Sequence, residues 1–100
     1  MTLVYRKRVG DEVSAIYEWY ESQRQGLGEE FIADFDAVVA MIVEFPQSFT
    51  RVNEKVRRAN FKRFPYSVFY QVESKRIVVL SVIHQSRDSH IWPLPRKRTR

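Results

Sequence analysis

Basic side chains and one histidine are the residues of this chain whose types and spacing suit chemistry. Four cations fall within one strand-like stretch, and a histidine and an arginine follow the last predicted strand: Arg57, Arg58, Lys62 and Arg63, then His84 and Arg87. Guanidinium groups bind phosphate through paired hydrogen bonds and stabilise charge that develops during phosphoryl transfer. A histidine that titrates near neutral pH can take the proton of a ribose 2′-hydroxyl. These groups together fit a metal-free ribonuclease site.

A structural role for the same residues is the competing interpretation. A lone histidine after a strand is more often a hydrogen-bonded structural residue than a catalyst. If residues 56–64 form one strand, Arg57 and Arg63 share one side of the sheet, and Arg58 and Lys62 share the other. At most half of the strand cations can then reach a common substrate.

Other classes of catalytic site lack their residues in this sequence. The chain has no cysteine, which excludes disulfides, thiolate metal sites and thiol catalysis. It also has no glycine-rich phosphate loop, no His-Glu-x-x-His motif and no Gly-x-Ser-x-Gly nucleophile elbow. We therefore expect no metal, no cofactor and no small-molecule substrate.

Charge divides the chain into two halves of opposite sign. Residues 1–50 carry 4 Lys and Arg against 9 Asp and Glu, whereas residues 51–100 carry 13 against 3, giving net charges of −5 and +10. One domain built from both halves has a polarised field. Such a basic face suits nucleic acid, the ribosome or an acidic protein partner, and the alternative is a basic surface that serves solubility alone.

The N-terminal half is predicted to form a short edge strand and two amphipathic helices. The strand covers residues 2–6, and the first helix runs from Asp11, as its N-cap, to near Gln25, because Gly26-Leu27-Gly28 places two helix breakers in three residues. The second helix starts near residues 29–30, and Pro46 ends it. Its apolar side chains recur every three or four positions: Phe31, Phe35, Val38, Val39, Ile42 and Phe45. The short connection predicts an antiparallel helical hairpin.

The C-terminal half is predicted to form an antiparallel meander over residues 56–64, 66–72 and 77–83, with a tight turn at 73–76. The expected fold is α+β, with the helical hairpin packed on one face of a three- to four-stranded antiparallel sheet. One domain covers residues 1–92, and a basic tail covers 93–100. The longest apolar run, residues 77–80, is too short to span a bilayer, and no signal peptide is recognised, so we expect a soluble, cytoplasmic protein without membrane association.

Two tryptophans are candidates for partner contacts. Trp19 lies off the apolar stripe of the first helix, and Trp92 lies near the end of the chain. Most other large aromatic side chains are expected to fill the core of so small a domain: Phe31, Phe35, Phe45, Phe64, Tyr66, Phe69 and Tyr70. Trp19 is the better candidate for an exposed anchor.

Three segments in this order resemble the RelE/ParE toxin superfamily of type II toxin–antitoxin systems. Residues 16–21 with Gly26-Leu27-Gly28 and the helix up to Pro46 resemble its helical hairpin. Residues 56–70, with Arg63-Phe64-Pro65-Tyr66, are similar to its central strands, and residues 77–88, with His84-Gln85-Ser86-Arg87, to its last strand and exit. The resemblance spans residues 3–92. It implies a growth-inhibiting toxin that a cognate antitoxin neutralises.

The resemblance leaves two mechanisms open. ParE-like members poison DNA gyrase, and the helical hairpin and His84-Gln85-Ser86 favour that side, with which plasmid stabilisation is associated. RelE-like members cleave mRNA on the ribosome; in that case His84 is the base, and Arg63 and Arg87 clamp the phosphate. Only Lys62 represents the lysine-rich central strand of the RelE pattern, and a tyrosine near the chain end is missing. We expect the ParE-like activity, without catalysis.

Contacts with the antitoxin or the target are then assigned to the basic and aromatic candidates: Arg57, Arg58, Lys62, Trp19 and Trp92. A third possibility is a non-toxic module that binds nucleic acid or a protein through the basic face alone. Growth arrest on expression, relieved by the product of the neighbouring gene, separates the toxins from this module.

Overall fold

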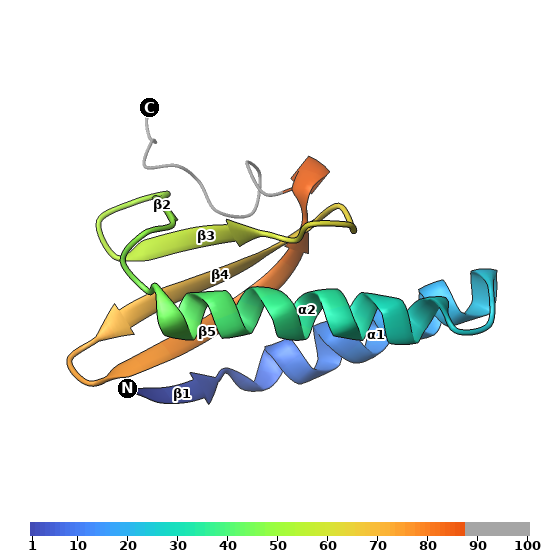
Figure 1. The fold of residues 1–100 in the computed structure, drawn as a ribbon, viewed down its shortest axis with the longest axis horizontal. Coiled ribbons are helices and arrows are strands. Elements are labelled where there is room, and N and C mark those ends of the chain that lie inside the picture. The colour runs from blue at the N-terminus through green and yellow to red at the C-terminus, as the bar shows by residue number, and fades with distance from the viewer. Residues whose placement is uncertain (88–100) are drawn as a thin grey trace.

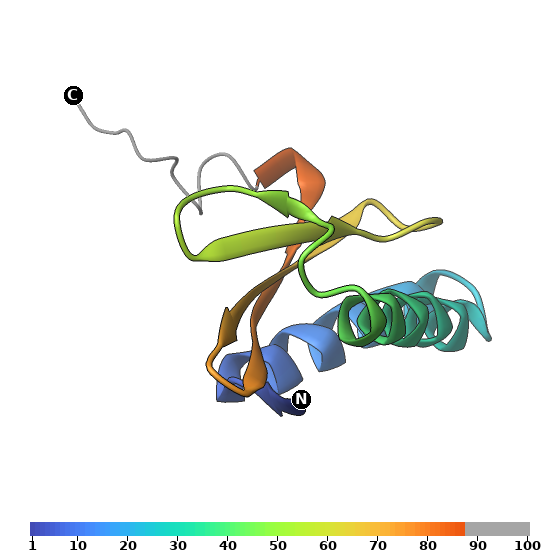
Figure 2. The same cartoon turned by 60° about the vertical axis from the view of Figure 1, so that its left-hand side comes forward.

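The computed structural model describes residues 1–87, so Trp92, the end of the predicted domain and the predicted tail at 93–100 lie outside the described residues. Two helices, α1 (Lys7–Gln23) and α2 (Leu27–Glu44), form a hairpin that packs on one face of a sheet (Figures 1 and 2). The sheet contains β1 (Thr2–Tyr5), β2 (Thr50–Arg51), β3 (Val56–Asn60), β4 (Tyr66–Glu73) and β5 (Arg76–His84), and a short 3-10 helix, η1 (Gln85–Arg87), follows. The predicted α+β class and helical hairpin are confirmed.

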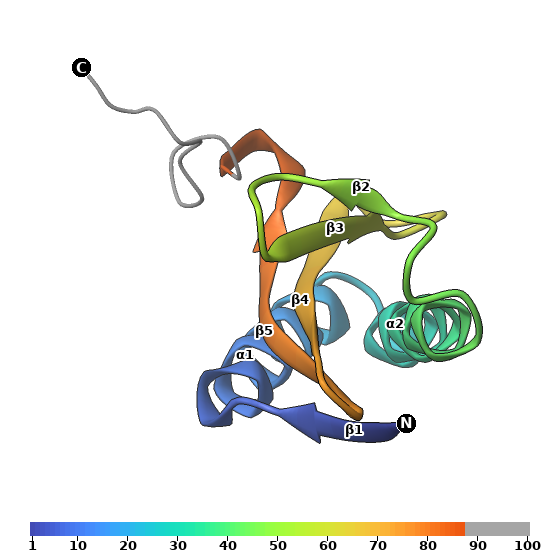
Figure 3. The same cartoon turned by 90° about the vertical axis from the view of Figure 1, so that its left-hand side faces the viewer.

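The sheet has five strands in the order β1-β5-β4-β3-β2 (Figure 3), one more than the largest number predicted. The strands β2 to β5 form an antiparallel meander, but β1 pairs with β5 in parallel, with Leu3 opposite Ile77. The prediction of a wholly antiparallel sheet was therefore wrong for the first strand. The helical hairpin and the strands β2 to β4 lie between β1 and β5 in the chain, and β5 then runs beside β1 in the same direction.

Both helices begin earlier than the sequence predicted. The first starts at Lys7 rather than after Asp11, and its N-cap, Arg6, makes no side-chain capping bond. Instead the Arg6 N–H donates to the carbonyl of Val79 (2.9 Å), and Val9 is buried, so attachment to the sheet starts the helix. Helix α2 starts at Leu27 because Glu21 of α1 accepts hydrogen bonds from the N–H groups of Gly26 and Gly28 (3.0 and 2.9 Å), as a capping side chain does. The predicted end of α2 before Pro46 is confirmed.

The strand β3, which corresponds to the first predicted strand of the meander, ends at Asn60, four residues earlier than predicted. Lys62 and Arg63 therefore lie in the loop of residues 61–65, and their predicted alternation across a strand was wrong. The chain turns because Phe61 and Phe64 are both buried under the helices and the buried carboxylate of Asp34 on α2 holds the backbone between them.

The main core lies between the helices and the sheet. The predicted stripe of α2 faces it from Phe31 to Ile42, both of which are fully buried. The prediction that Phe45 fills the core was wrong, because this residue lies at the helix end and is 48% exposed. Phe31 is the centre of an aromatic cluster, with ring centroids 5.3 Å from Phe61 and 5.6 Å from both Phe64 and Tyr66. A smaller apolar cluster lies on the sheet face away from the helices: Val56, Phe69 and Ile83, with Val52 and Leu80 packed against it.

Candidate functional site

A cleft between α1 and the C-terminal end of β5 brings two of the predicted site residues together. His84 and Arg87 line it, with Tyr66 from β4 and Arg8 from α1. Its volume is about 240 Å³, and the rest of its wall is mostly apolar: Ala15, Ile16, Val82 and Ile83, with Glu12 beside them. The cleft thus combines cations, aromatic rings and aliphatic side chains.

Hydrogen bonds fix the orientation of the His84 ring. Its Nδ1 accepts the backbone N–H of Ser86 (3.1 Å), and the Ser86 hydroxyl lies 2.9 Å from the same atom. The ring also packs edge-on against Tyr66, with centroids 5.0 Å apart. Because Nδ1 is an acceptor, the proton of the neutral imidazole is on Nε2. His84 is therefore arranged to donate a hydrogen bond from Nε2, not to remove a proton.

The strand ends around His84 are tied together. The Gln85 N–H donates to the carbonyl of Pro65 (2.8 Å), and the Gln85 side-chain amide donates to the carbonyl of Tyr66 (3.0 Å). These bonds hold η1, and with it Arg87, beside the start of β4. Burial, followed by the neighbouring Tyr20, raises the pKa of the Tyr66 phenol, while the positive charge of Arg87 lowers it. The positive charge of Arg87 is therefore felt at the Tyr66 hydroxyl.

The wall of the cleft on the helix side depends on Glu12. Its carboxylate accepts hydrogen bonds from the buried Ser81 hydroxyl (2.8 and 3.0 Å to its two oxygens) and from the Val82 N–H (2.9 Å). The register of β4 and β5 shifts here, because Phe69 pairs with Ser81 and Tyr70 with Val79, which leaves Leu80 as an extra residue. Glu12 thus attaches α1 to the irregular part of β5, and Arg8 pairs with it one turn earlier (3.3 Å).

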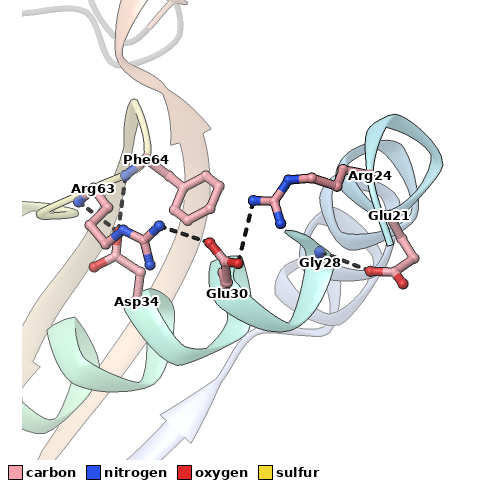
Figure 4. Close-up of polar contacts among 7 residues, drawn as sticks. All are labelled: Glu21, Arg24, Gly28, Glu30, Asp34, Arg63 and Phe64. Atoms are coloured by element: carbon pink, nitrogen blue, oxygen red, sulfur yellow. Dashed lines mark hydrogen bonds and ion pairs between the residues drawn. The ribbon is translucent and has the colours of Figure 1, made fainter. Parts of the chain in front are cut away.

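Arg63, the third predicted catalytic residue, lies elsewhere and does not line the cleft. Its guanidinium pairs with Glu30 on α2 (2.8 Å) and lies 5.5 Å from the centroid of the Phe64 ring. Glu30 also pairs with Arg24 (3.4 Å), so it joins the helical hairpin to the loop (Figure 4). The hydrogen bond from Arg63 is the main cause that lowers the pKa of the Glu30 carboxyl.

Asp34 on α2 fixes the backbone of the same loop. Its side chain accepts the N–H groups of Arg63 (2.8 Å) and Phe64 (3.0 Å) (Figure 4). It also accepts the N–H of Lys62 (3.3 Å), and the residue is only 6% exposed. The three bonds account for both carboxylate oxygens, which a buried charge requires. Asp34 and the cleft residues Arg8, Glu12 and Tyr66 were not predicted as site residues. The i, i+4 spacing of Arg8 and Glu12 was the available signal for that pair.

The predicted partner-binding residues are spread over separate surfaces. Arg57 donates to the carbonyls of Gln47 (3.0 Å) and Phe49 (2.7 Å), so it holds the segment between α2 and β2. Arg58 is half-buried and pairs in register with Phe69, on the sheet face away from the helices. Lys62 is exposed beside an apolar groove of about 390 Å³ along α2. Trp19 is 57% exposed, as its position off the stripe predicted.

Neither a metal centre nor a membrane-crossing helix is found in the part of the chain that the structure describes. Among residues 1–87, no three His, Asp or Glu side chains are grouped so that they could hold a metal ion. None of the helices in that range is long and apolar enough to cross a membrane.

A two-helix hairpin on a five-stranded sheet with a basic C-terminal half defines a small α+β domain of the RelE/ParE type. The family of the ParE toxin of type II toxin-antitoxin system, parDE, matches residues 3–89, and the chain belongs to this toxin family. A solved structure described as a chromosomal ParDE TA system from P. aeruginosa has the same fold, with a TM-score of 0.75 and 23% identity over 84% of this chain and 95% of that chain. No curated protein sequence matches.

Proposed function

We propose that this chain stops growth by binding DNA gyrase, without cleaving nucleic acid, and that a cognate antitoxin neutralises it. Membership in the ParE toxin family supports the toxic activity. The observation that favours binding over cleavage is the separation of the predicted catalytic set. Arg63 pairs with Glu30, whereas His84 and Arg87 line a different surface.

Ribonuclease chemistry needs more than these residues offer in this arrangement. A 2′-hydroxyl must lose its proton to a positioned base, and cations must lie beside the phosphate where negative charge develops. The Nδ1 atom of His84 already accepts the Ser86 N–H, and Arg63 points to α2. A gyrase poison needs only a binding surface, so the separation of these residues is compatible with that function.

The proposed antitoxin binds through an acidic segment. Residues 51–100 carry a net charge of +10, and the solved relative is described as a toxin–antitoxin pair. A disordered acidic segment that folds on this surface gains from electrostatic attraction during its approach. The association rate constant should therefore fall strongly between low and physiological ionic strength.

A ribosome-dependent endonuclease is the second candidate, and one observation favours it. The cleft holds His84, Arg87, Tyr66 and Arg8 within one small volume, and these are residue types that a metal-free ribonuclease uses. For this activity His84 must exchange its Nδ1 hydrogen bond, or its tautomer, when RNA binds.

Expression in a susceptible host separates the two candidates. The wild-type chain should arrest growth and induce a DNA-damage response while translation continues at first, and co-expression of the neighbouring gene should restore growth. The variant His84→Gln should remain toxic, because glutamine keeps a polar side chain of similar reach but cannot act as a base. Loss of a general base lowers a catalytic rate by about 10²–10⁴-fold. A folded His84→Gln protein without toxicity, together with ribosomal mRNA cleavage by the wild type, supports the nuclease instead.

A further inference from the structure

We infer that the cleft between α1 and β5 binds an acidic side chain, with an aliphatic neighbour, from an extended segment of a protein partner. This inference rests on the proposed function in one respect, which is that the partner is the antitoxin. The surface is defined by the cations Arg8 and Arg87, the Nε2 donor of His84, and the apolar side chains of Ala15 and Ile16. We call it the α1–β5 cleft.

The cations of the α1–β5 cleft come from two different elements. Arg8 lies on α1 and Arg87 in η1, and both are exposed. Arg8 contacts Glu12 through Nε at 3.3 Å and makes no other hydrogen bond within residues 1–87. A guanidinium carries five N–H donors, so the Nη groups of Arg8 remain for a carboxylate. A ligand between Arg8 and Arg87 is thus held from both sides.

Glu12 also lies in the cleft, and β5 occupies its carboxylate oxygens. Both its oxygens accept hydrogen bonds from Ser81, and one also accepts the Val82 N–H. It therefore holds the wall of the cleft in place and compensates Arg8 only in part. With Arg87 and the Nε2–H of His84, the cleft keeps an excess of donors, which suits one carboxylate.

The apolar part of the cleft favours a peptide over nucleic acid. Ala15, which is exposed, and Ile16, which is half-buried, offer an aliphatic surface beside the cations. An aliphatic side chain next to a glutamate gains by burial there, whereas a phosphodiester backbone has no apolar group to place on it. The mixture of cations and aliphatic side chains thus matches an acidic, partly apolar segment.

The same face of α1 continues beyond the cleft to an exposed aromatic residue. Arg8, Glu12, Ala15 and Trp19 are spaced by four, three and four residues, so they lie on one side of the helix. Trp19 is 57% exposed and packs edge-on against Tyr20, with centroids 5.1 Å apart. A segment that enters the α1–β5 cleft and follows α1 meets Trp19 as its next contact.

Fluorescence anisotropy with a labelled synthetic peptide of alternating leucine and glutamate tests the cleft on the purified full chain. Exchange of both cations, Arg8→Gln with Arg87→Gln, should weaken binding by about tenfold or more, since hydrogen bonds between charged partners are lost. The control exchanges two exposed cations elsewhere, Arg51→Gln with Lys75→Gln, and removes the same charge. It should weaken binding only slightly.

A second pair of variants blocks the site without touching a cation. Ala15→Glu puts a negative charge into the cleft, while Ser14→Glu puts it at the exposed neighbouring position, outside the residues that line the cleft. Only Ala15→Glu should abolish peptide binding. A thermal unfolding curve for each variant shows that the fold is intact, so a loss of binding is not mistaken for unfolding.

Three results overturn the inference. The first is an equal loss of affinity in both double variants, which indicates general charge attraction. The second is equally tight binding of a peptide that alternates glycine and glutamate, which removes the role of the apolar wall. The third is a DNA duplex that binds the wild-type chain and depends on Arg8 and Arg87 while the peptide does not, which assigns the cleft to nucleic acid. Because the assay uses purified protein, it can fail while growth arrest stands, or succeed while growth arrest is absent.

Discussion

Two contacts within residues 1–87 place a helix carboxylate beside arginine side chains, and they differ in what is left for a partner. At the first, α2 meets the loop of residues 61–65, where Asp34 holds three backbone N–H groups and Glu30 pairs with Arg63. At the second, α1 meets the end of β5, where Glu12 holds the strand and the cations Arg8 and Arg87 line an open cleft. The first contact builds the fold, and the second leaves cations available for binding.

This difference shows that the position of a cation in the sequence does not decide its role. Arg63 and Arg87 are both exposed basic residues near strand ends. Arg63 forms an ion pair with Glu30, with 2.8 Å between Nη2 and Oε1. Arg87 instead lines the cleft with Tyr66 and His84. Changes at the α2 contact should therefore alter stability, and changes at the α1–β5 cleft should alter binding with little loss of stability.

The largest effect on the free energy of unfolding is expected in the aromatic cluster around Phe31 on α2. Phe31→Ala removes a fully buried ring that packs against Phe61, Phe64 and Tyr66. The free energy of unfolding in urea should fall by about 3–5 kcal/mol, enough to unfold a marginal domain. Met41→Ala on the same helix is the control, since Met41 is 43% exposed. Similar losses in both variants would contradict this description of the core.

The next effect concerns the carboxylate that fixes the loop. Asp34→Ala leaves three backbone N–H groups of residues 62–64 without their acceptor, and the free energy of unfolding should fall by about 2–3 kcal/mol. Asp36→Ala, at an exposed position of the same helix, should change it by less than about 0.5 kcal/mol. Chemical denaturation measures both. An Asp34→Ala protein as stable as Asp36→Ala would show that the loop does not need this anchor.

Two glycines provide a matched pair with opposite signs. A Cβ at Gly28 would lie 2.7 Å from the Tyr17 ring, whereas nothing lies within 4 Å of one at Gly10 in α1. Gly10→Ala should stabilise the chain by up to about 1 kcal/mol through helix propensity. Gly28→Ala should destabilise it by about 1 kcal/mol, because crowding between the two helices exceeds that gain. Thermal unfolding would contradict the close helix contact if both midpoints rose.

A smaller effect with a pH signature is expected at Tyr70, whose hydroxyl donates to the carbonyl of Pro46 (2.7 Å). Tyr70→Phe should cost about 1 kcal/mol at neutral pH. Burial raises the pKa of this phenol from 10.0 to about 12, so the folded state keeps the proton to higher pH than the unfolded state. The contribution of Tyr70 is then complete below pH 10 and is lost as the pH rises towards 12. The stability difference between wild type and Tyr70→Phe should shrink over that range, and a constant difference would contradict the raised pKa.

The smallest effect on the free energy of unfolding is expected in the α1–β5 cleft. Arg8→Gln with Arg87→Gln should change the free energy of unfolding by less than about 0.5 kcal/mol, because the contact of Arg8 with Glu12 is an exposed ion pair. Urea titration tests this alongside the peptide binding assay. A loss as large as that of Asp34→Ala would mean that the two contacts do not differ in the way proposed.

The sequence predicted the parts of the fold that depend on local pattern. The stripe of α2 from Phe31 to Ile42 and the break at Pro46 follow from helical spacing, and the exposure of Trp19 follows from its place off the stripe of α1. The parallel pairing of β1 was missed, because four residues carry too little pattern to indicate a partner more than seventy positions away.

Contacts between distant residues explain the remaining errors. The start of α1 depends on the bond from Arg6 to Val79, and the end of β3 depends on Asp34, and neither is a local signal. The same holds for the candidate site. The sequence indicated His84 and Arg87, but it did not predict that Arg57 would hold the segment after α2 or that Arg63 would pair with Glu30.

The central claim is that this ParE-family chain acts by binding gyrase and not by cleaving RNA, and a supercoiling assay with purified DNA gyrase tests it most directly. The wild-type chain and His84→Gln, each added to gyrase and relaxed plasmid, should both inhibit supercoiling and cause cleaved DNA to accumulate. A preparation mixed beforehand with the neighbouring gene product should do neither. Undisturbed supercoiling at concentrations of wild-type chain that cleave mRNA on purified ribosomes would contradict the account.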